Sequence, residues 1–147
     1  METIIRYMKE TDRQKILEMM TVFYASDAVS TNGSPKIFQA DMEACLGESP
    51  YLEGYVFEGD GQILGYAMVA KSFSTEFGKP CIWIEDIYLE EAYRGMGIGS
   101  SFFRFMEEKY PDALFRLELE EENARALHVY KKQGYDFLPY LEMKKGN

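Results

Sequence analysis

The chain has 147 residues, of which 46% are hydrophobic and 28% charged, and this composition is typical of one soluble globular domain spanning residues 1–147. Its formal net charge of -9 argues against a nucleic-acid partner, because such partners are bound through clustered lysines and arginines. The apolar runs are far shorter than the ~20 residues that span a bilayer, so we expect no membrane partner and a cytoplasmic location.

The first part of the sequence predicts one strand and two helices. Residues 3–8 carry apolar side chains at alternating positions, which predicts a strand. Residues 11–14 (TDRQ) match a capping box and predict the start of a helix that ends near Ala28. Residues 30–35 combine Ser, Asn, Gly and Pro and predict a break, after which residues 36–46 resume a helical pattern.

The middle of the sequence predicts three strands. Residues 51–58 and 62–73 are strand-like, and the short turn between them predicts that they pair as an antiparallel hairpin. Residues 74–80 predict a polar loop, which leads into a buried strand over residues 82–89.

The last part of the sequence predicts two helices and two strands. The first helix carries a stripe of apolar residues at helical spacing, namely Ile98, Phe102, Phe105 and Met106. A strand over residues 114–119, a helix over 124–133 and a strand over 135–143 follow, and the acidic residues 118–122 predict a solvated turn. The order β-α-α-β-β-β-α-β-α-β predicts a mixed α/β fold, with a right-handed crossover between the fourth and fifth strands.

Residues 94–99 (RGMGIG), which we call the glycine corner, connect the central strand to a helix N-terminus. Free backbone N–H groups and the helix dipole make such a corner an anion site, most naturally for phosphate. A nucleotide P-loop is excluded because no lysine follows Gly99, and a dinucleotide fingerprint fits poorly because Ser100 replaces its third glycine. A tight turn without a ligand is the alternative.

The glycine corner, with its R-x-x-G-x-G spacing, resembles the GNAT family of N-acetyltransferases. The strand over residues 84–89 and a later segment extend the resemblance over the last half of the chain. The later segment is similar to the family pattern N-x-x-A-x-x-x-Y-x-x-x-G-F/Y at Asn123, Tyr130, Gly134 and Tyr135.

The resemblance implies a single N-acetyltransferase domain with the GNAT fold. Acetyl-coenzyme A would be the co-substrate, and its acetyl group would pass to an amine of a small molecule or peptide by direct attack in a ternary complex. Homodimers are frequent in the family, so a homodimer is a further expectation. The alternative function is a non-catalytic module that binds or senses acyl-coenzyme A. No metal is expected, because Cys45 and Cys81 lack the spacing of metal ligands.

In the GNAT family the fourth and fifth strands diverge, and the cofactor arm lies between them on the edge of the fourth strand. Carried over to this sequence, the resemblance implies a set of cofactor-binding residues on the central strand, the glycine corner and the last helix. They are Ile87, Tyr88, Leu89, Arg94, Gly95, Met96, Gly97, Ile98, Gly99, Ser100, Asn123 and Tyr130.

Acetyl transfer from a thioester requires a base for the amine and an acid for the leaving thiolate. The resemblance implies Tyr130 as the acid, with a purely structural place in the helix as the alternative. Glu85 stands where some polyamine acetyltransferases of the family have a glutamate base. We expect burial to raise its pKa, and it could act directly or through water. A structural ion pair is the alternative for Glu85.

The acceptor amine is expected to approach from the side of the first two helices. Phe23 and Tyr24 would form apolar walls there, and Glu85 would add negative charge below them. An amine with an apolar body and one cationic centre suits this site better than an anionic acceptor, which the net acidity of the chain would repel.

Overall fold

The computed structural model describes residues 1–31 and 33–146, so Asn32, within the predicted break at residues 30–35, lies outside the described residues. The helices and strands are β1 (Thr3–Tyr7), α1 (Arg13–Tyr24), α2 (Pro35–Leu46), β2 (Leu52–Gly59), β3 (Gln62–Ser74), β4 (Lys79–Leu89), α3 (Ile98–Lys109), β5 (Leu114–Leu117) and α4 (Ala124–Lys132). In these described ranges, no helix combines the length and the apolar composition needed to cross a membrane.

The five strands form one mixed sheet in the order β1-β2-β3-β4-β5. The pairs β1–β2, β2–β3 and β3–β4 are antiparallel, and β5 is parallel to β4. The predicted hairpin between β2 and β3 is confirmed, and its turn places Asp60 and Gly61 at positive φ angles of 52° and 75°. The mixed α/β class is therefore confirmed.

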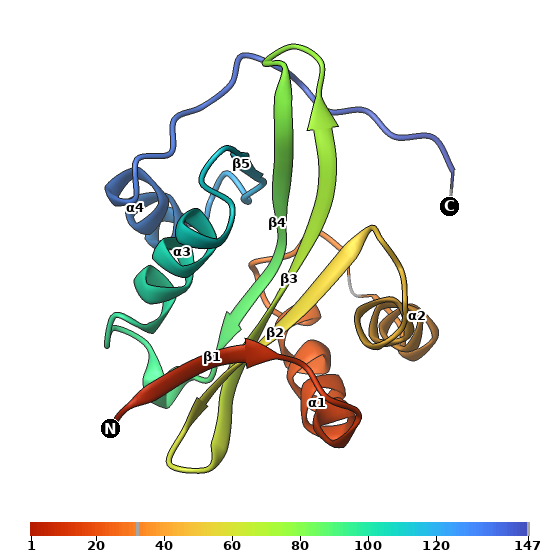
Figure 1. Cartoon of the computed structure of the whole chain (residues 1–147), viewed down its shortest axis with the longest axis vertical. Coiled ribbons are helices and arrows are strands. Elements are labelled where there is room, and N and C mark those ends of the chain that lie inside the picture. Colours follow the sequence, from red (N-terminus) through yellow and green to blue (C-terminus); the bar gives the residue numbers. More distant parts are fainter. Residues whose placement is uncertain (32, 147) are drawn as a thin grey trace.

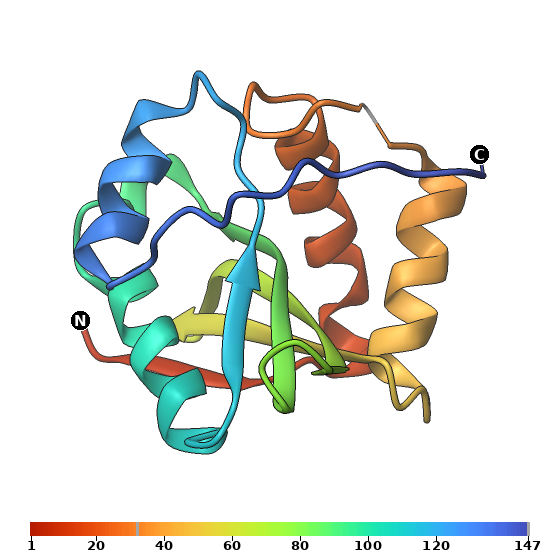
Figure 2. The ribbon, with the colours of Figure 1, turned by 90° about the horizontal axis from the view of Figure 1, so that it is seen from above.

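Helices cover both faces of the sheet, with α1 and α2 on one face and α3 and α4 on the other (Figures 1 and 2). Alternate residues of the central strands supply the two cores, because neighbouring side chains of a strand point to opposite faces. Val56 and Tyr66 pack with the α1–α2 side, whereas Tyr55 and Phe57 pack with the α3 side. Burial on both faces explains why these strands are almost continuously apolar.

The helix α3 buries three of the four residues of its predicted stripe, Ile98, Phe102 and Met106. Phe105 is half-buried and packs against the same core, in which Phe103 is also fully enclosed. The face that α3 turns to the sheet is therefore wider than the predicted stripe.

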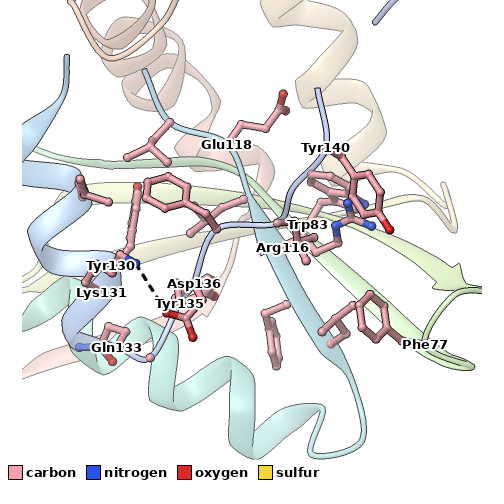
Figure 3. A pocket seen from close by; sticks show the side chains of 18 of the residues that line it. Phe77, Trp83, Arg116, Glu118, Tyr130, Lys131, Gln133, Tyr135, Asp136 and Tyr140 are labelled. Atoms are coloured by element: carbon pink, nitrogen blue, oxygen red, sulfur yellow. Dashed lines mark ion pairs between the residues drawn. The ribbon is translucent and has the colours of Figure 1, made fainter. Parts of the chain in front are cut away.

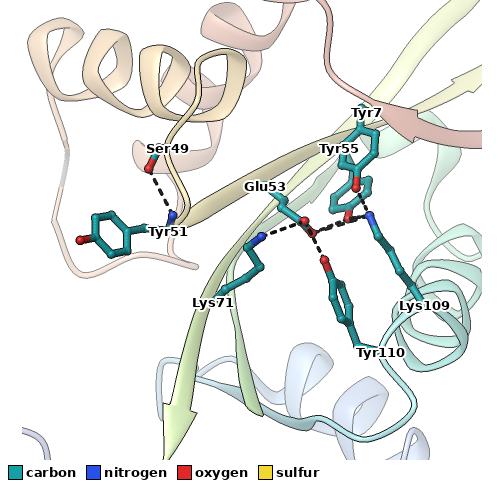
Figure 4. Close-up of polar contacts among 8 residues, drawn as sticks. All are labelled: Tyr7, Ser49, Tyr51, Glu53, Tyr55, Lys71, Lys109 and Tyr110. Atoms are coloured by element: carbon teal, nitrogen blue, oxygen red, sulfur yellow. Dashed lines mark hydrogen bonds and ion pairs between the residues drawn. The ribbon is translucent and has the colours of Figure 1, made fainter.

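A polar cluster ties the C-terminal end of α3 to the sheet (Figure 4). Tyr55 and Tyr110 donate hydrogen bonds of 2.7 and 2.6 Å to the carboxylate of Glu53, and Lys71 approaches it at 3.3 Å. Burial opposes the charge of Glu53, but the two phenols, Lys109 and Lys71 together outweigh it and lower its pKa. This cluster lies on the α3 face of the sheet.

The predicted capping box at residues 11–14 is wrong. A short 3-10 turn (Glu10–Asp12) precedes α1, which begins at Arg13. Buried Asp12 binds elsewhere: its carboxylate accepts a hydrogen bond of 2.8 Å from the Lys9 N–H and two of 2.9 and 3.1 Å from Arg6. This salt bridge to β1 sets the entry to the helix, in place of the Thr11 hydroxyl.

The helix α1 also ends at Tyr24, earlier than the predicted end near Ala28. The Ser26 hydroxyl and the Ser26 N–H both donate to the Phe23 carbonyl, at 2.6 and 3.1 Å. A serine side chain that competes for a backbone carbonyl favours a turn over a further helical turn.

Residues 135–143 do not form the predicted last strand. Instead the segment crosses over β5 without pairing, and Figure 2 shows its course from α4. Pro139 lacks the N–H that a ladder would need, and Leu141 and Met143 are 98% and 97% exposed. A cavity of about 540 Å³ lies between this segment, β5 and α4 (Figure 3).

Candidate functional site

The strands β4 and β5 pair over only four residues and then diverge. Cys81–Ile84 of β4 face Leu114–Leu117 of β5, and β4 continues to Leu89 whereas β5 stops. A cleft of about 1560 Å³ opens at this point, between the C-terminal end of α1, the last part of β4, the glycine corner and α4. Among the described residues, no strand lies beside the last five residues of β4 on the cleft side, so their backbone groups there, apart from the Leu89 carbonyl, are available to a ligand.

The glycine corner forms the wall of this cleft at the N-terminus of α3. Gly95 and Gly97 adopt positive φ angles of 78° and 83°, which residues other than glycine rarely adopt. In the described part of the chain, no side chain caps the helix. A Cβ atom added at Gly95, Gly97 or Gly99 would meet nothing within 4 Å. The backbone therefore borders open space that can admit an anionic group such as a pyrophosphate close to the helix N–H groups.

Arg94 braces the corner against the end of β4. Its Nε donates a hydrogen bond of 2.8 Å to the Leu89 carbonyl, and its guanidinium lies 5.7 Å from the centre of the Tyr88 ring. Met96, predicted from the resemblance to bind the cofactor, is 58% exposed and does not line the cleft.

The structure brings the other predicted site residues together around the one cleft. They are Phe23, Tyr24, Glu85, Ile87, Tyr88, Leu89, Arg94, Gly95, Gly97, Ile98, Gly99, Ser100, Asn123 and Tyr130.

The helix α4 places Tyr130 in the lining of the cleft. Asn123 caps the helix as predicted, since its Oδ1 accepts a hydrogen bond of 3.1 Å from the Ala126 N–H. The Tyr130 ring packs between Phe103 and Tyr135, with ring centres 5.9 and 6.0 Å apart. Burial raises the pKa of Tyr130, so its phenol keeps its proton at neutral pH. Tyr130 also lines the smaller cavity shown in Figure 3.

A β-bulge separates the two neighbouring carboxylates of β4. Ile84 pairs with Val69 and Asp86 with Met68, which leaves Glu85 as the extra residue. Glu85 lines the cleft, whereas Asp86 is only 4% exposed. Although Glu85 reaches solvent through the cleft, the surrounding protein desolvates its carboxylate and, with nearby acidic side chains, raises its pKa, as expected.

Sequence reasoning missed the contacts that Asp86 makes on the α1 side of the cleft. Tyr24 donates a hydrogen bond of 2.8 Å to one oxygen of Asp86, and Tyr66 donates one of 2.9 Å to the other. Phe23 packs edge-on against Tyr24 at 5.2 Å and lies 6.0 Å from Tyr88, which completes an aromatic wall. The only signal in the sequence was a second carboxylate beside Glu85 on a buried strand.

Glu118 and Glu142 add negative charge to the same cleft. A hydrogen bond with Glu142, together with desolvation and nearby acidic charges, raises the pKa of Glu118 to about 7. Glu118 was expected in a solvated turn, and Glu142 in a strand that does not form. The unpaired C-terminal segment brings the two together.

Comparisons with known proteins point to one family. Residues 14–135 match the family model described as "Acetyltransferase (GNAT) family". Thialysine N-epsilon-acetyltransferase of Bos taurus is 32% identical over 151 residues, covering 95% of this chain and 87% of the relative. The protein of the same name from Sus scrofa is 32% identical over 143 residues, covering 89% and 82%.

Solved structures share the fold. A structure described as "a possible acetyltransferase from Clostridium difficile 630" has a TM-score of 0.83 at 17% identity, covering 99% of this chain and 97% of the other. AAC(6')-Iy, solved with a bisubstrate analog named CoA-S-monomethyl-acetylneamine, has a TM-score of 0.77 at 16% identity, covering 100% and 99%. Both similarities extend over nearly the whole length of the two chains.

Proposed function

The chain belongs to the GNAT acetyltransferase family and is an N-acetyltransferase, and from this premise we propose the transfer of an acetyl group from acetyl-coenzyme A to a small primary amine, by direct attack in a ternary complex. One observation carries the proposal: a single cleft joins the glycine corner, the unpaired end of β4, Glu85 and Tyr130. The curated relatives are named as enzymes, which favours this function over a sensing module.

The glycine corner suits the pyrophosphate of acetyl-coenzyme A, because it offers free N–H groups beside open space. The backbone of Ile87 and Leu89, on the part of β4 that β5 does not cover, would hold the pantetheine arm through hydrogen bonds. The co-substrate supplies an acetyl group activated as a thioester. The protein supplies its orientation and the two proton movements.

Glu85 is the proposed base. It lies at the bulge of β4, faces the cleft and has a raised pKa, so it can take the proton that the neutral amine nitrogen gives up as it attacks more readily than an ordinary glutamate. It would act directly or through one water. Tyr130, protonated at neutral pH because its burial raises its pKa, would hold the proton that the leaving sulfur requires.

The acceptor would lie between the aromatic wall and the acidic residues of the cleft. Phe23 and Tyr24 supply apolar surface, and Glu85 and the Glu118–Glu142 pair, in which Glu118 is partly protonated near neutral pH, supply negative charge. This combination favours a cationic amine with an apolar stem and disfavours anionic acceptors. The relatives' name points to thialysine, whose side chain ends in a primary amine, as the first acceptor to test.

The test is the release of free thiol from acetyl-coenzyme A with thialysine, lysine and a panel of other primary amines. We expect thiol release above the no-amine control with at least one primary amine, and no increase with a quaternary ammonium of similar size. Binding of acetyl-coenzyme A with no amine-dependent thiol release across the panel would contradict the proposal and favour the sensing module.

The pH dependence tests the role of Glu85. A base acts only when deprotonated, so kcat/KM should fall as the pH drops through the raised pKa of Glu85, above the range of an ordinary glutamate. Glu85→Gln should remove this acid limb and lower kcat/KM by about 10²-fold. Glu142→Gln should move the limb to lower pH, because Glu142 is one of the charges, with Asp86 and Asp41, that raise the pKa of Glu85. An unchanged limb in Glu85→Gln would assign the base to another group.

A further inference from the structure

The buried carboxylate of Asp86 has no role in the proton transfers described above. It is 4% exposed, and burial raises its pKa. Among the described residues, the groups that favour its charged form are two phenols, Tyr24 and Tyr66, rather than a cation. A carboxylate is a costly group to bury in a protein core, which suggests that its partners matter for function.

One of these partners reaches the cleft. Tyr24 is the last residue of α1 and lines the cleft, whereas Tyr66 is fully buried in the core. Phe38 and Phe23 hold the Tyr24 ring from two sides, with ring centres 5.3 and 5.2 Å away. The side chain of Tyr24 is therefore fixed in orientation by its packing and by Asp86.

The bond to Asp86 decides what Tyr24 can offer to a substrate. A phenol has one O–H, and Tyr24 donates it to Asp86 at 2.8 Å. Only the lone pairs of its oxygen remain, so it can accept a hydrogen bond from a substrate N–H. The carboxylate partner polarises the phenol and strengthens it as an acceptor.

We propose that Asp86 is a positioning residue for the acceptor amine: through Tyr24 it presents a fixed hydrogen-bond acceptor beside Glu85. The bulge of β4 turns Glu85 into the cleft while the next residue anchors Tyr24 beneath it. The inference rests on the proposed acetyl transfer and makes its substrate more specific. A primary amine has two N–H bonds as it attacks, one for the base and one for Tyr24, whereas a secondary amine has one. Glu85 and Tyr24 together therefore select primary amines.

The test compares two matched acceptors in Tyr24→Phe, Asp86→Asn, the double variant and a control. The acceptors are the better of thialysine and lysine, and the same compound with one methyl group on its side-chain amine. Tyr24→Phe should raise KM for the primary amine about 5- to 10-fold, the loss expected for one hydrogen bond, and leave kcat within about twofold. The preference for the primary over the methylated amine should fall by the same factor, and acetyl-coenzyme A affinity by calorimetry should not change.

Asp86→Asn should have the same direction of effect. Because Asp86 acts through Tyr24, the double variant should be no worse in KM than the more affected single variant. If Asp86→Asn does not fold, Tyr24→Phe decides by itself.

The matched control is Tyr55→Phe, which makes the same change at a fully buried phenol, whereas Tyr24 is half-buried. Tyr55 also donates to a carboxylate, Glu53 at 2.7 Å, but it lies in the core on the α3 face of the sheet. It should lose stability and keep the KM and the amine preference of the wild type. Unchanged KM and preference in Tyr24→Phe, or equal changes in Tyr55→Phe, would overturn this inference but leave the proposed function standing. A wild type that releases no thiol with any amine would overturn the proposed function, and this inference with it.

Discussion

Tyr130→Phe is expected to lower kcat by about 10²-fold or more, equivalent to about 3 kcal/mol of transition-state stabilisation, with acetyl-coenzyme A affinity unchanged. The phenyl ring preserves the packing against Phe103 and Tyr135 and removes only the hydroxyl. Because burial raises the pKa of Tyr130, the phenol is protonated over the pH range in which the amine can attack. Steady-state kinetics and calorimetry of the same preparations separate turnover from binding.

Tyr135→Phe is the control for this variant. Tyr135 packs against Tyr130 and is likewise half-buried, but it lines the smaller cavity and not the cleft. It should keep kcat within about twofold of the wild type, whereas a general acid contributes much more. If Tyr130→Phe also stayed within about twofold, Tyr130 would be a packing residue only.

Gly99→Val is expected to weaken acetyl-coenzyme A binding by at least about 30-fold, or about 2 kcal/mol, because its side chain would fill the space beside the helix N–H groups. Gly99 is a better position than Gly97 for this test. Gly97 has a φ of 83°, so a valine there would also strain the turn, whereas Gly99 is helical and a Cβ meets nothing within 4 Å. Valine also has a somewhat better helix propensity than glycine, so the fold should be retained.

Ser101→Val controls for the addition of a branched side chain to the same helical turn. Ser101 lies in the first turns of α3 but does not line the cleft. Its affinity for acetyl-coenzyme A should stay within about twofold of the wild type when both variants are measured by calorimetry. Equal affinity in Gly99→Val and the wild type, with both folded, would remove the glycine corner as the phosphate site.

Local signals in the sequence predicted most of the scaffold. The glycine corner, the Asn123 cap and the turn at residues 59–61 depend on neighbouring residues only, and each forms as predicted. The resemblance to the GNAT family rests on the same kind of short-range pattern, and the family match over residues 14–135 confirms it.

Predictions failed where a distant residue competed with a local pattern or where a single residue interrupted it. The capping box at residues 11–14 was displaced by the salt bridge of Asp12 with Arg6 on β1. The last strand was predicted from apolar composition, but the residues after α4 cross β5 without pairing, and Pro139 cannot donate to a ladder. Glu142 then meets Glu118 in the cleft, a contact that no spacing in the sequence indicates.

The sequence by itself determined the order of the elements up to the last helix, the glycine corner and the candidates Tyr130 and Glu85, because these follow from periodicity, glycine spacing and motif. Only the tertiary structure decided which way the two carboxylates of β4 face and which residues they contact. The bulge at Glu85 separates it from Asp86, and the hydrogen bond between Asp86 and Tyr24 joins residues 62 positions apart. Strand register and contacts of this range depend on how whole elements pack, so the α1 side of the cleft could not be derived from the chain one segment at a time.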